Sequence, residues 1–209
     1  MNLLRYGIIL SFFITVIYLF FLIIRTFSFG KKSLYAEPQG DEKKGIIYAF
    51  GKGMMPWEKE SAKKHLLTYF AGIFYHFGIF SAAFYVISVI IHFYIGALIV
   101  NLIRALVFMG ILCGIGLLVK RIILPYMRKI SAPDDFLANI LVDVFLILAF
   151  IDSYTLELRN VFLASVIILL LYIPLGKIRH CFFFFYSRVV FGMFYGRRGV
   201  FPQSQSRRY

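Results

Sequence analysis

The chain has 209 residues, of which 61% are hydrophobic, and its mean hydropathy is +0.82. These values lie far outside the range of soluble domains and indicate an integral membrane protein. The net charge of +13 accompanies no basic soluble face with interleaved aromatic residues, which excludes a nucleic-acid-binding domain and favours anionic lipid and an acidic docking partner. The two cysteines, Cys113 and Cys181, form no haem-attachment, zinc or disulfide pattern.

Five apolar runs in the chain are long enough to cross a bilayer. The predicted spans are Tyr6–Ile24, Leu66–Ile91, Ile95–Val119, Asp134–Ile151 and Val161–Tyr186. Because the first run ends at Arg25 without a small-residue cleavage site, we expect a retained anchor and not a signal peptide. The sequence therefore predicts an all-α fold, an integral membrane five-helix bundle.

Basic residues gather on one side of this predicted bundle. The segments 25–64, 120–129 and 177–208 hold nine, four and seven lysines and arginines, and only Arg5, Arg104 and Arg159 lie elsewhere. By the positive-inside rule, the amino terminus lies outside and the carboxyl terminus lies in the cytoplasm. The expected organisation is a first transmembrane helix at 1–25, a cytoplasmic loop at 26–64, helices two to five at 65–190 and a cytoplasmic tail at 191–209.

Two histidines lie in apolar segments near opposite ends of the chain. His76 stands about 16 Å along the second predicted span from its cytoplasmic start, and His180 lies near the cytoplasmic end of the fifth. An imidazole in hydrocarbon is costly unless something binds it. Two of them on separate helices can approach one axis, so they are predicted to be axial ligands of a haem iron. The structural alternatives are a bond from His76 to a neighbouring helix and an interfacial position for His180.

The other two histidines allow several interpretations. His65 precedes His76 by 11 residues, so on one continuous helix both would point the same way. His65 is a candidate for binding iron or a haem propionate, or it is simply solvated. His92 is expected at the outer interface, with a quinone or haem role as the less favoured interpretation.

Two charged residues inside the predicted spans should face the bundle interior, because an unpaired charge in lipid is expensive. An ion pair between Arg104 and Asp152 is the structural interpretation of the arginine, and contact with a propionate or a quinone is the functional one. Asp143, midway along the fourth predicted span, is a candidate proton relay. The segment Ser131–Asp135 has the composition of a helix start, with serine as cap, proline in the first turn and two acids near the positive end of the dipole.

Four segments resemble one protein family. They are Gly51–Ser61, Ala71–Phe80, Ser131–Phe136 and Pro174–His180. In them the chain resembles the membrane cytochrome b family of respiratory nitrate reductase gamma subunits, and in particular its branch of heterodisulfide reductase and sulfite-reduction-associated membrane subunits. The resemblance covers residues 50–198, and it implies that the second and fifth helices carry haem ligands at His76 and His180.

The chain departs from the family at two positions. Members with two haems carry further histidines where this sequence has Val86 and Phe162. Both ligands of the outer haem are therefore missing together, and the resemblance implies one haem b. Two haems, with His65 or His92 recruited as a ligand, are the alternative.

The resemblance also implies a function. It is electron transfer between a membrane quinone or quinol, such as menaquinone, and a cytoplasmic iron–sulfur subunit that is heterodisulfide-reductase-like or ferredoxin-like. The chain would lie in the prokaryotic cytoplasmic (inner) membrane and hold no complete active site of its own. The segment Gly51–Ala62 would be a docking surface for the soluble subunit or an interfacial lead-in. The rival interpretation is a haem-free or two-haem anchor subunit of a respiratory or transport complex.

Overall fold

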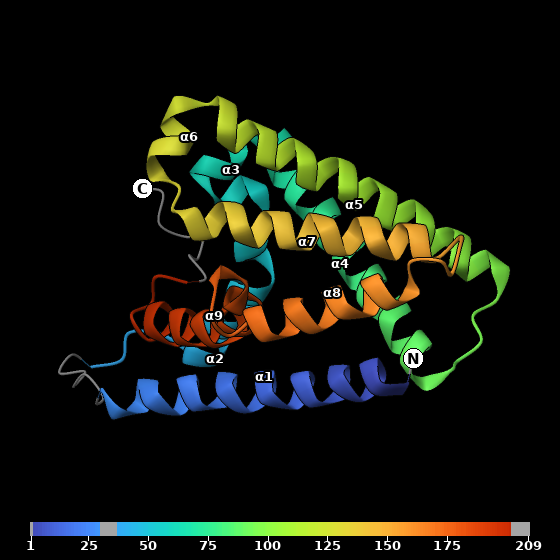
Figure 1. Ribbon diagram of the computed structural model, residues 1–209. Helices are drawn as coiled ribbons and strands as arrows, with labels where there is room; N and C mark the ends of the chain where they lie inside the picture. Colours follow the sequence, from blue (N-terminus) through green and yellow to red (C-terminus); the bar gives the residue numbers. More distant parts are fainter. Residues whose placement is uncertain (1, 30–36, 202–209) are drawn as a thin grey trace. The chain divides into compact units, whose positions relative to one another are not determined.

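The computed structural model describes residues 2–29 and 37–201, and every regular element in them is helical (Figure 1). Helices α1 (Asn2–Ser28), α4 (Leu66–Ile91) and α5 (Ala97–Ile123) are long and apolar enough to cross a membrane. A fourth span results if α8 (Arg159–Tyr172) and α9 (His180–Arg197) count as one broken helix. Only 22% to 28% of the residues in the three long spans are buried, which leaves most of their apolar surface for lipid.

Helix α7 (Pro133–Asp152) forms where the fourth span was predicted. It is not among the helices apolar enough to cross a membrane, because it carries four aspartates. Pro133 is its first residue, as expected, and the Asp135 carboxylate accepts the backbone N–H of Ala132 at 2.8 Å. The expected serine cap is wrong, since the hydroxyl of Ser131 donates backward to the carbonyl of Met127 at 2.8 Å.

The fifth predicted span is interrupted. Helix α8 ends at Tyr172, and the short 3₁₀ helix η3 (Lys177–Arg179) leads into α9. Pro174 lies in the break; it has no N–H to donate and its ring collides with the preceding turn, so the helix cannot continue through it. The continuous helix Val161–Tyr186 is therefore wrong, and α9 runs to Arg197, beyond the predicted start of the tail at 191.

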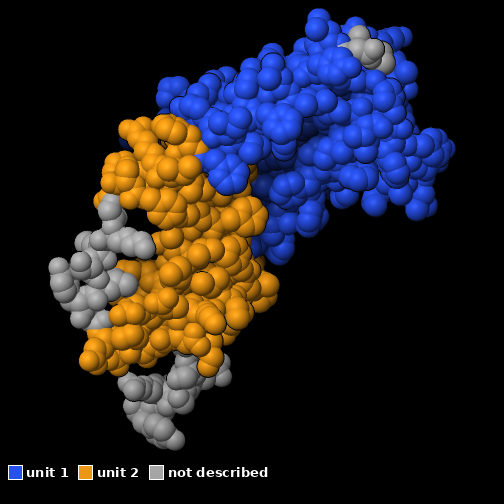
Figure 2. Space-filling view, turned by 90° about the horizontal axis from the view of Figure 1, so that it is seen from below, with its two compact units in different colours: residues 1–20, 67–178 blue, residues 21–66, 179–209 orange. Residues whose placement is uncertain are grey.

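The chain divides into two compact units (Figure 2). Unit 1 comprises residues 1–20 and 67–178, and unit 2 comprises residues 21–66 and 179–209. In unit 1, α5 packs along α7, α7 packs against α8, and α6 (Pro125–Ile130) connects α5 to α7. Buried side chains from α1, α4, α5, α7 and α8 form one apolar core, which includes Ile8, Ala82, Val107, Leu146, Phe162 and Leu163.

In unit 2, α2 (Glu42–Phe50) packs along α9, and the chain then passes through η1 (Lys52–Met54), η2 (Pro56–Glu58) and α3 (Glu60–Lys64). Glycines bring the two helices into backbone contact. A Cβ on Gly45 would lie 2.1 Å from the carbonyl oxygen of Gly192, and one on Gly192 would lie 2.5 Å from the Cα of Ile46. Small residues let helix backbones approach this closely. Part of the predicted loop 26–64 is thus a helix held against the C-terminal helix.

A hydrogen-bonded group ties the segment after α2 together. The Tyr48 hydroxyl donates to Glu58 Oε2 at 2.7 Å, and Lys52 Nζ lies 3.5 Å from Glu58 Oε1. The hydrogen bond from Tyr48 is the main cause that lowers the pKa of Glu58; desolvation, the next largest cause, opposes it, and the charge of Lys52 adds to the lowering. Burial, followed by the bond to Glu58, raises the pKa of Tyr48 to about 12.

Adding one methyl group at the α2–α9 contact should separate the helices. We expect Gly192→Ala to cost about 1–3 kcal/mol of folding free energy, because the new Cβ overlaps backbone atoms that cannot yield. Limited trypsin digestion at Lys43 and Lys44 of α2 measures the loss. Gly116→Ala is the matched control: it too lies inside a helix, but its Cβ would meet nothing within 4 Å. Equal digestion of the two variants would contradict the contact.

Acid should release Glu58 from its partners. Its lowered pKa means that the contribution of this group to stability is present above the ordinary value of 4.5 and is lost as the pH falls through the lowered value. The fluorescence of Trp57, the only tryptophan, reports this change next to Glu58. Tyr48→Phe should raise the midpoint toward 4.5, whereas Tyr126→Phe should leave it in place. An unchanged midpoint in Tyr48→Phe would count against the hydrogen bond.

Candidate functional site

The structure defines which ring nitrogen of His76 carries its lone pair. His76 lies on the exposed side of α4, and its Nδ1 is 2.6 Å from the carbonyl oxygen of Gly72, one turn earlier. A carbonyl oxygen can only accept, so Nδ1 is the donor of this bond, and in the tautomer that makes it the lone pair is on Nε2. Histidines that bind metals commonly hold their other ring N–H in this way. A Cβ on Gly72 would meet no atom within 4 Å, so the surface beside the imidazole has room.

His180 is the first residue of α9 and is exposed. It follows the break at Pro174 and the 3₁₀ turn Lys177–Arg179. His180 belongs to unit 2, whereas His76 belongs to unit 1. Its place at a helix start, and not inside a continuous helix, is the consequence of the break that the sequence analysis missed.

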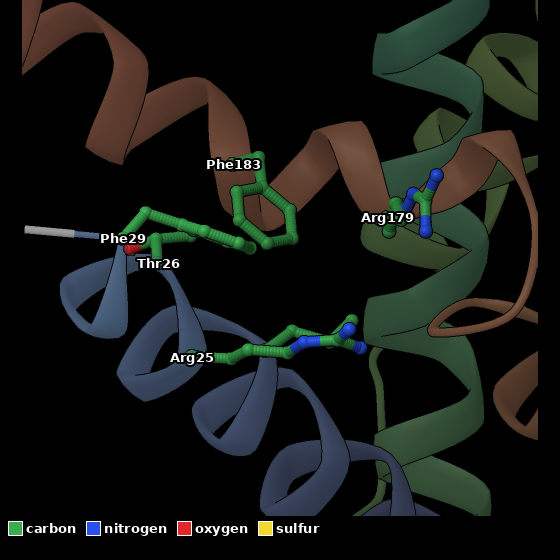
Figure 3. A pocket seen from close by; sticks show the side chains of 6 residues that line it. Arg25, Thr26, Phe29, Arg179 and Phe183 are labelled. Carbon is green, nitrogen blue, oxygen red and sulfur yellow. The ribbon is translucent and has the colours of Figure 1, made fainter.

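A groove in unit 2 lies next to His180 in the sequence (Figure 3). It has a volume of about 410 Å³, and its lining residues are Leu22, Arg25, Thr26, Phe29, Arg179 and Phe183. The guanidinium groups of Arg25 and Arg179 lie on opposite sides of the hollow, one from α1 and one from the turn before α9 (Figure 3). Neither arginine forms an ion pair within residues 2–29 and 37–201. The groove combines two positive charges with apolar walls, which suits an amphipathic anion.

The sequence analysis counted Arg25 and Arg179 only among the basic residues that set the orientation. A signal for the groove was present, because Arg25 ends the first apolar run and Arg179 interrupts the fifth. What the sequence could not give was that the end of α1 and the start of α9 lie together in one unit.

The two positions at which the family carries outer-haem ligands are buried in unit 1. Val86 is 6% exposed and Phe162 is fully buried, and both belong to the apolar core. The Phe162 ring lies 6.0 Å from that of Tyr85 and 6.1 Å from that of Phe145, measured between centroids. Packed side chains therefore occupy this region of the core.

Arg104 and Asp152 do not form the expected ion pair. Asp152 pairs with Arg159, Nε to Oδ1 at 2.7 Å, and accepts a hydrogen bond from the Tyr85 hydroxyl at 2.9 Å. Because Arg159 comes from the start of α8, it meets the end of α7 across the short intervening loop. Neither this arginine nor Tyr85 was predicted as a partner, although Arg159 is one of the few basic residues outside the segments predicted to be cytoplasmic.

Arg104 binds the end of α7 in another way. All three of its side-chain nitrogens have protein partners, namely Ser153 Oγ, the Ser153 carbonyl and Asn101 Oδ1. Its guanidinium carbon also lies 3.8 Å from the centre of the Tyr154 ring. A cation at a helix C-terminus is favourable because the exposed carbonyls there carry partial negative charge. These contacts are structural, and the propionate or quinone role of Arg104 remains a prediction.

The other two histidines lie at helix ends. His65 follows α3 in a non-helical conformation, with φ −134° and ψ 50°, and α4 begins only at Leu66. The expectation that His65 and His76 share a helix face is therefore wrong. His92 follows α4 with a positive φ of 55°, and its Nε2 is hydrogen-bonded to Arg5 Nη1. Within the described residues, no group of three or more histidine, cysteine or acidic side chains is arranged to hold a metal ion.

Comparisons with protein-family models, with curated proteins and with solved structures found no match to this chain.

Proposed function

We propose that the chain is a membrane cytochrome b subunit that carries electrons between a membrane quinone and a cytoplasmic iron–sulfur partner. One b-type haem is held by His76 and His180. The five-helix topology, with the amino terminus outside and the carboxyl terminus in the cytoplasm of a prokaryote, is part of the same proposal. The resemblance in the segments around His76 and His180 supplies the family, and the three long apolar helices support the membrane location.

The observation that carries the proposal is the state of the His76 ring. Its Nδ1–H is bound to the Gly72 carbonyl at 2.6 Å, so the lone pair that could bind iron is on Nε2. A Cβ on Gly72 would meet no atom within 4 Å, so there is open space on the face of α4 that carries the ring. Coordination by two histidines would leave iron no open position, which suits electron transfer and not oxygen chemistry.

Burial of Val86 and Phe162 supports a single haem. A second haem bound as in the two-haem members would need ligands at these positions and space between them. The core instead packs Phe162 against Tyr85 and Phe145, and protein cores leave few voids of that size.

The groove between Arg25 and Arg179 suits the propionate groups of the haem. It lies beside His180 in the sequence, and two guanidinium groups can form charge-assisted hydrogen bonds to two carboxylates. Leu22, Phe29 and Phe183 give it apolar walls beside the two charges. We propose these arginines for the role that the sequence analysis assigned to His65 and Arg104.

The segment after α2, Gly51–Ala62, is the proposed docking surface for the iron–sulfur subunit. Trp57 is 64% exposed and Met55 is 40% exposed, and Lys52 and Lys59 lie beside them in the sequence. Exposed apolar and aromatic side chains rimmed by charge are typical of protein interfaces.

Haem content tests the proposal. We expect purified protein to contain one haem b per chain by the pyridine haemochrome assay, with a reduced-minus-oxidised spectrum of a b-type cytochrome. His76→Ala and His180→Ala should each abolish the haem, because a single remaining ligand holds it weakly. His92→Ala and His65→Ala should retain it.

Two other outcomes of these assays would favour the alternative functions. Protein that folds and inserts without visible absorbance would establish the haem-free anchor. Two haems per chain, with one lost in His65→Ala or His92→Ala, would establish the two-haem alternative.

The two arginines of the groove should affect the haem potential. Removing a positive charge near the iron stabilises its more positive, oxidised state, so Arg25→Gln and Arg179→Gln should each lower the midpoint potential. The haem content should stay close to that of the wild type. A redox titration measures the change, and Arg128→Gln, an exposed residue outside the groove, is the control. Unchanged midpoint potentials in both groove variants would show that the haem propionates do not bind in the groove.

A further inference from the structure

Asp143 is a buried carboxylate that the proposed electron transfer does not use. It lies midway along α7 and is 5% exposed. Its Oδ2 accepts a hydrogen bond from Asn139 Nδ2 at 2.9 Å, whereas its Oδ1 is buried and has no hydrogen-bond partner among the described residues. A polar atom left in this state is costly, and natural proteins contain few of them.

Atoms from α4 and α5 pack closely around Asp143 Oδ1. A Cβ on Gly114 of α5 would lie 2.1 Å from Oδ1 and 2.5 Å from the Tyr75 ring of α4. Asn139 Nδ2 also lies 3.2 Å from the Tyr75 hydroxyl and 3.4 Å from the Gly114 carbonyl oxygen. Three helices therefore meet at one polar group, and only glycine at position 114 leaves room for the carboxylate.

Within residues 2–29 and 37–201, no positive charge faces this carboxylate. The groups packed on it are the Tyr75 hydroxyl from α4, the Gly114 backbone from α5 and the Asn139 amide from its own helix. Asp152, at the end of the same helix, has instead the guanidinium of Arg159 at 2.7 Å. A buried ionised carboxylate without a cation costs several kcal/mol. Asp152 is neutralised by Arg159, whereas Asp143 is neutralised most simply by a proton on Oδ1.

Polar side chains connect this site to one end of α7. Asp135, Asn139 and Asp143 are spaced four residues apart, so they lie along one face of the helix over about 12 Å. Asp135 forms ion pairs with Arg121 at 3.2 Å and Lys177 at 3.0 Å. The basic residues gathered at this end assign it to the cytoplasm. Asn139 lies between the charged end and the buried acid.

We propose that Asp143 is a proton-binding site inside the helical bundle, which exchanges its proton with the cytoplasmic end of α7 past Asn139 and Tyr75. The proton comes from water at the Asp135 end and is held on Asp143 Oδ1. The site uses neither His76 nor His180, so it exists with or without haem. Quinone chemistry, which takes up protons with electrons, would be one use of it.

A hydrophobic carbodiimide tests the site in the unmodified full chain. Dicyclohexylcarbodiimide adds to a carboxyl group only when that group supplies a proton, and it leaves a stable N-acylurea on the acid. We expect peptide mass spectrometry to find the adduct on Asp143 in micelles, with a yield that falls as the pH is raised from about 5 to about 9. Asp152, paired with Arg159, should stay unmodified throughout and is the internal control.

Infrared spectroscopy tests whether protons reach Asp143 from the end of α7 past Asn139. The C=O band of a protonated carboxyl group shifts on transfer to heavy water, and the shift should be fast in the wild type and at least several-fold slower in Asn139→Leu. Asp143→Asn identifies the band by removing it. The proposal is overturned if folded protein is never labelled at Asp143, if Asp152 is labelled equally, or if the yield is independent of pH. Protection by sodium or lithium ions would overturn it too, because the site would then bind a metal cation.

Discussion

Polar groups inside apolar helices have to be bonded within the protein, because hydrocarbon offers them no water. Each polar side chain in the long helices meets this requirement in its own way. His76 donates to the carbonyl of the turn below it, and Asp152 takes Arg159 and Tyr85 as partners. Asp143 satisfies one oxygen through Asn139, and its other oxygen has no hydrogen-bond partner in the described part of the chain. The proposed haem ligand and the proposed proton site both follow from these bonding arrangements.

Backbone contacts through glycine make the bonding arrangements feasible. Gly114 leaves space for the Asp143 carboxylate between α5 and α7, and Gly45 and Gly192 bring α2 onto α9. In lipid, helices gain little from burying apolar side chains, so close packing and hydrogen bonds have to hold them together. In unit 2, α2 is also joined to the segment that follows it, because the Tyr48 hydroxyl of α2 donates to Glu58, next to Trp57.

Hydropathy predicted the apolar helices α1 and α4 well, because long uniform runs leave little choice of structure. It failed at the fifth helix, where the helix-breaking effect of Pro174 outweighs the apolar run. It also paired Arg104 with Asp152 by depth alone. The partner in the structure is Arg159, because the loop between α7 and α8 is short enough to return the chain to the same end. The groove between Arg25 and Arg179 depends on contacts between segments far apart in the sequence, and no spacing rule could have predicted it.

The central claim is that one iron is bound by two histidines of this chain. Electron paramagnetic resonance of the oxidised protein, prepared with ¹⁵N-labelled histidine, tests it most directly. The account predicts one low-spin ferric species whose electron spin couples to nitrogens of two histidine rings. The absence of a ferric signal, a high-spin signal with one histidine, or two distinct low-spin species would contradict it.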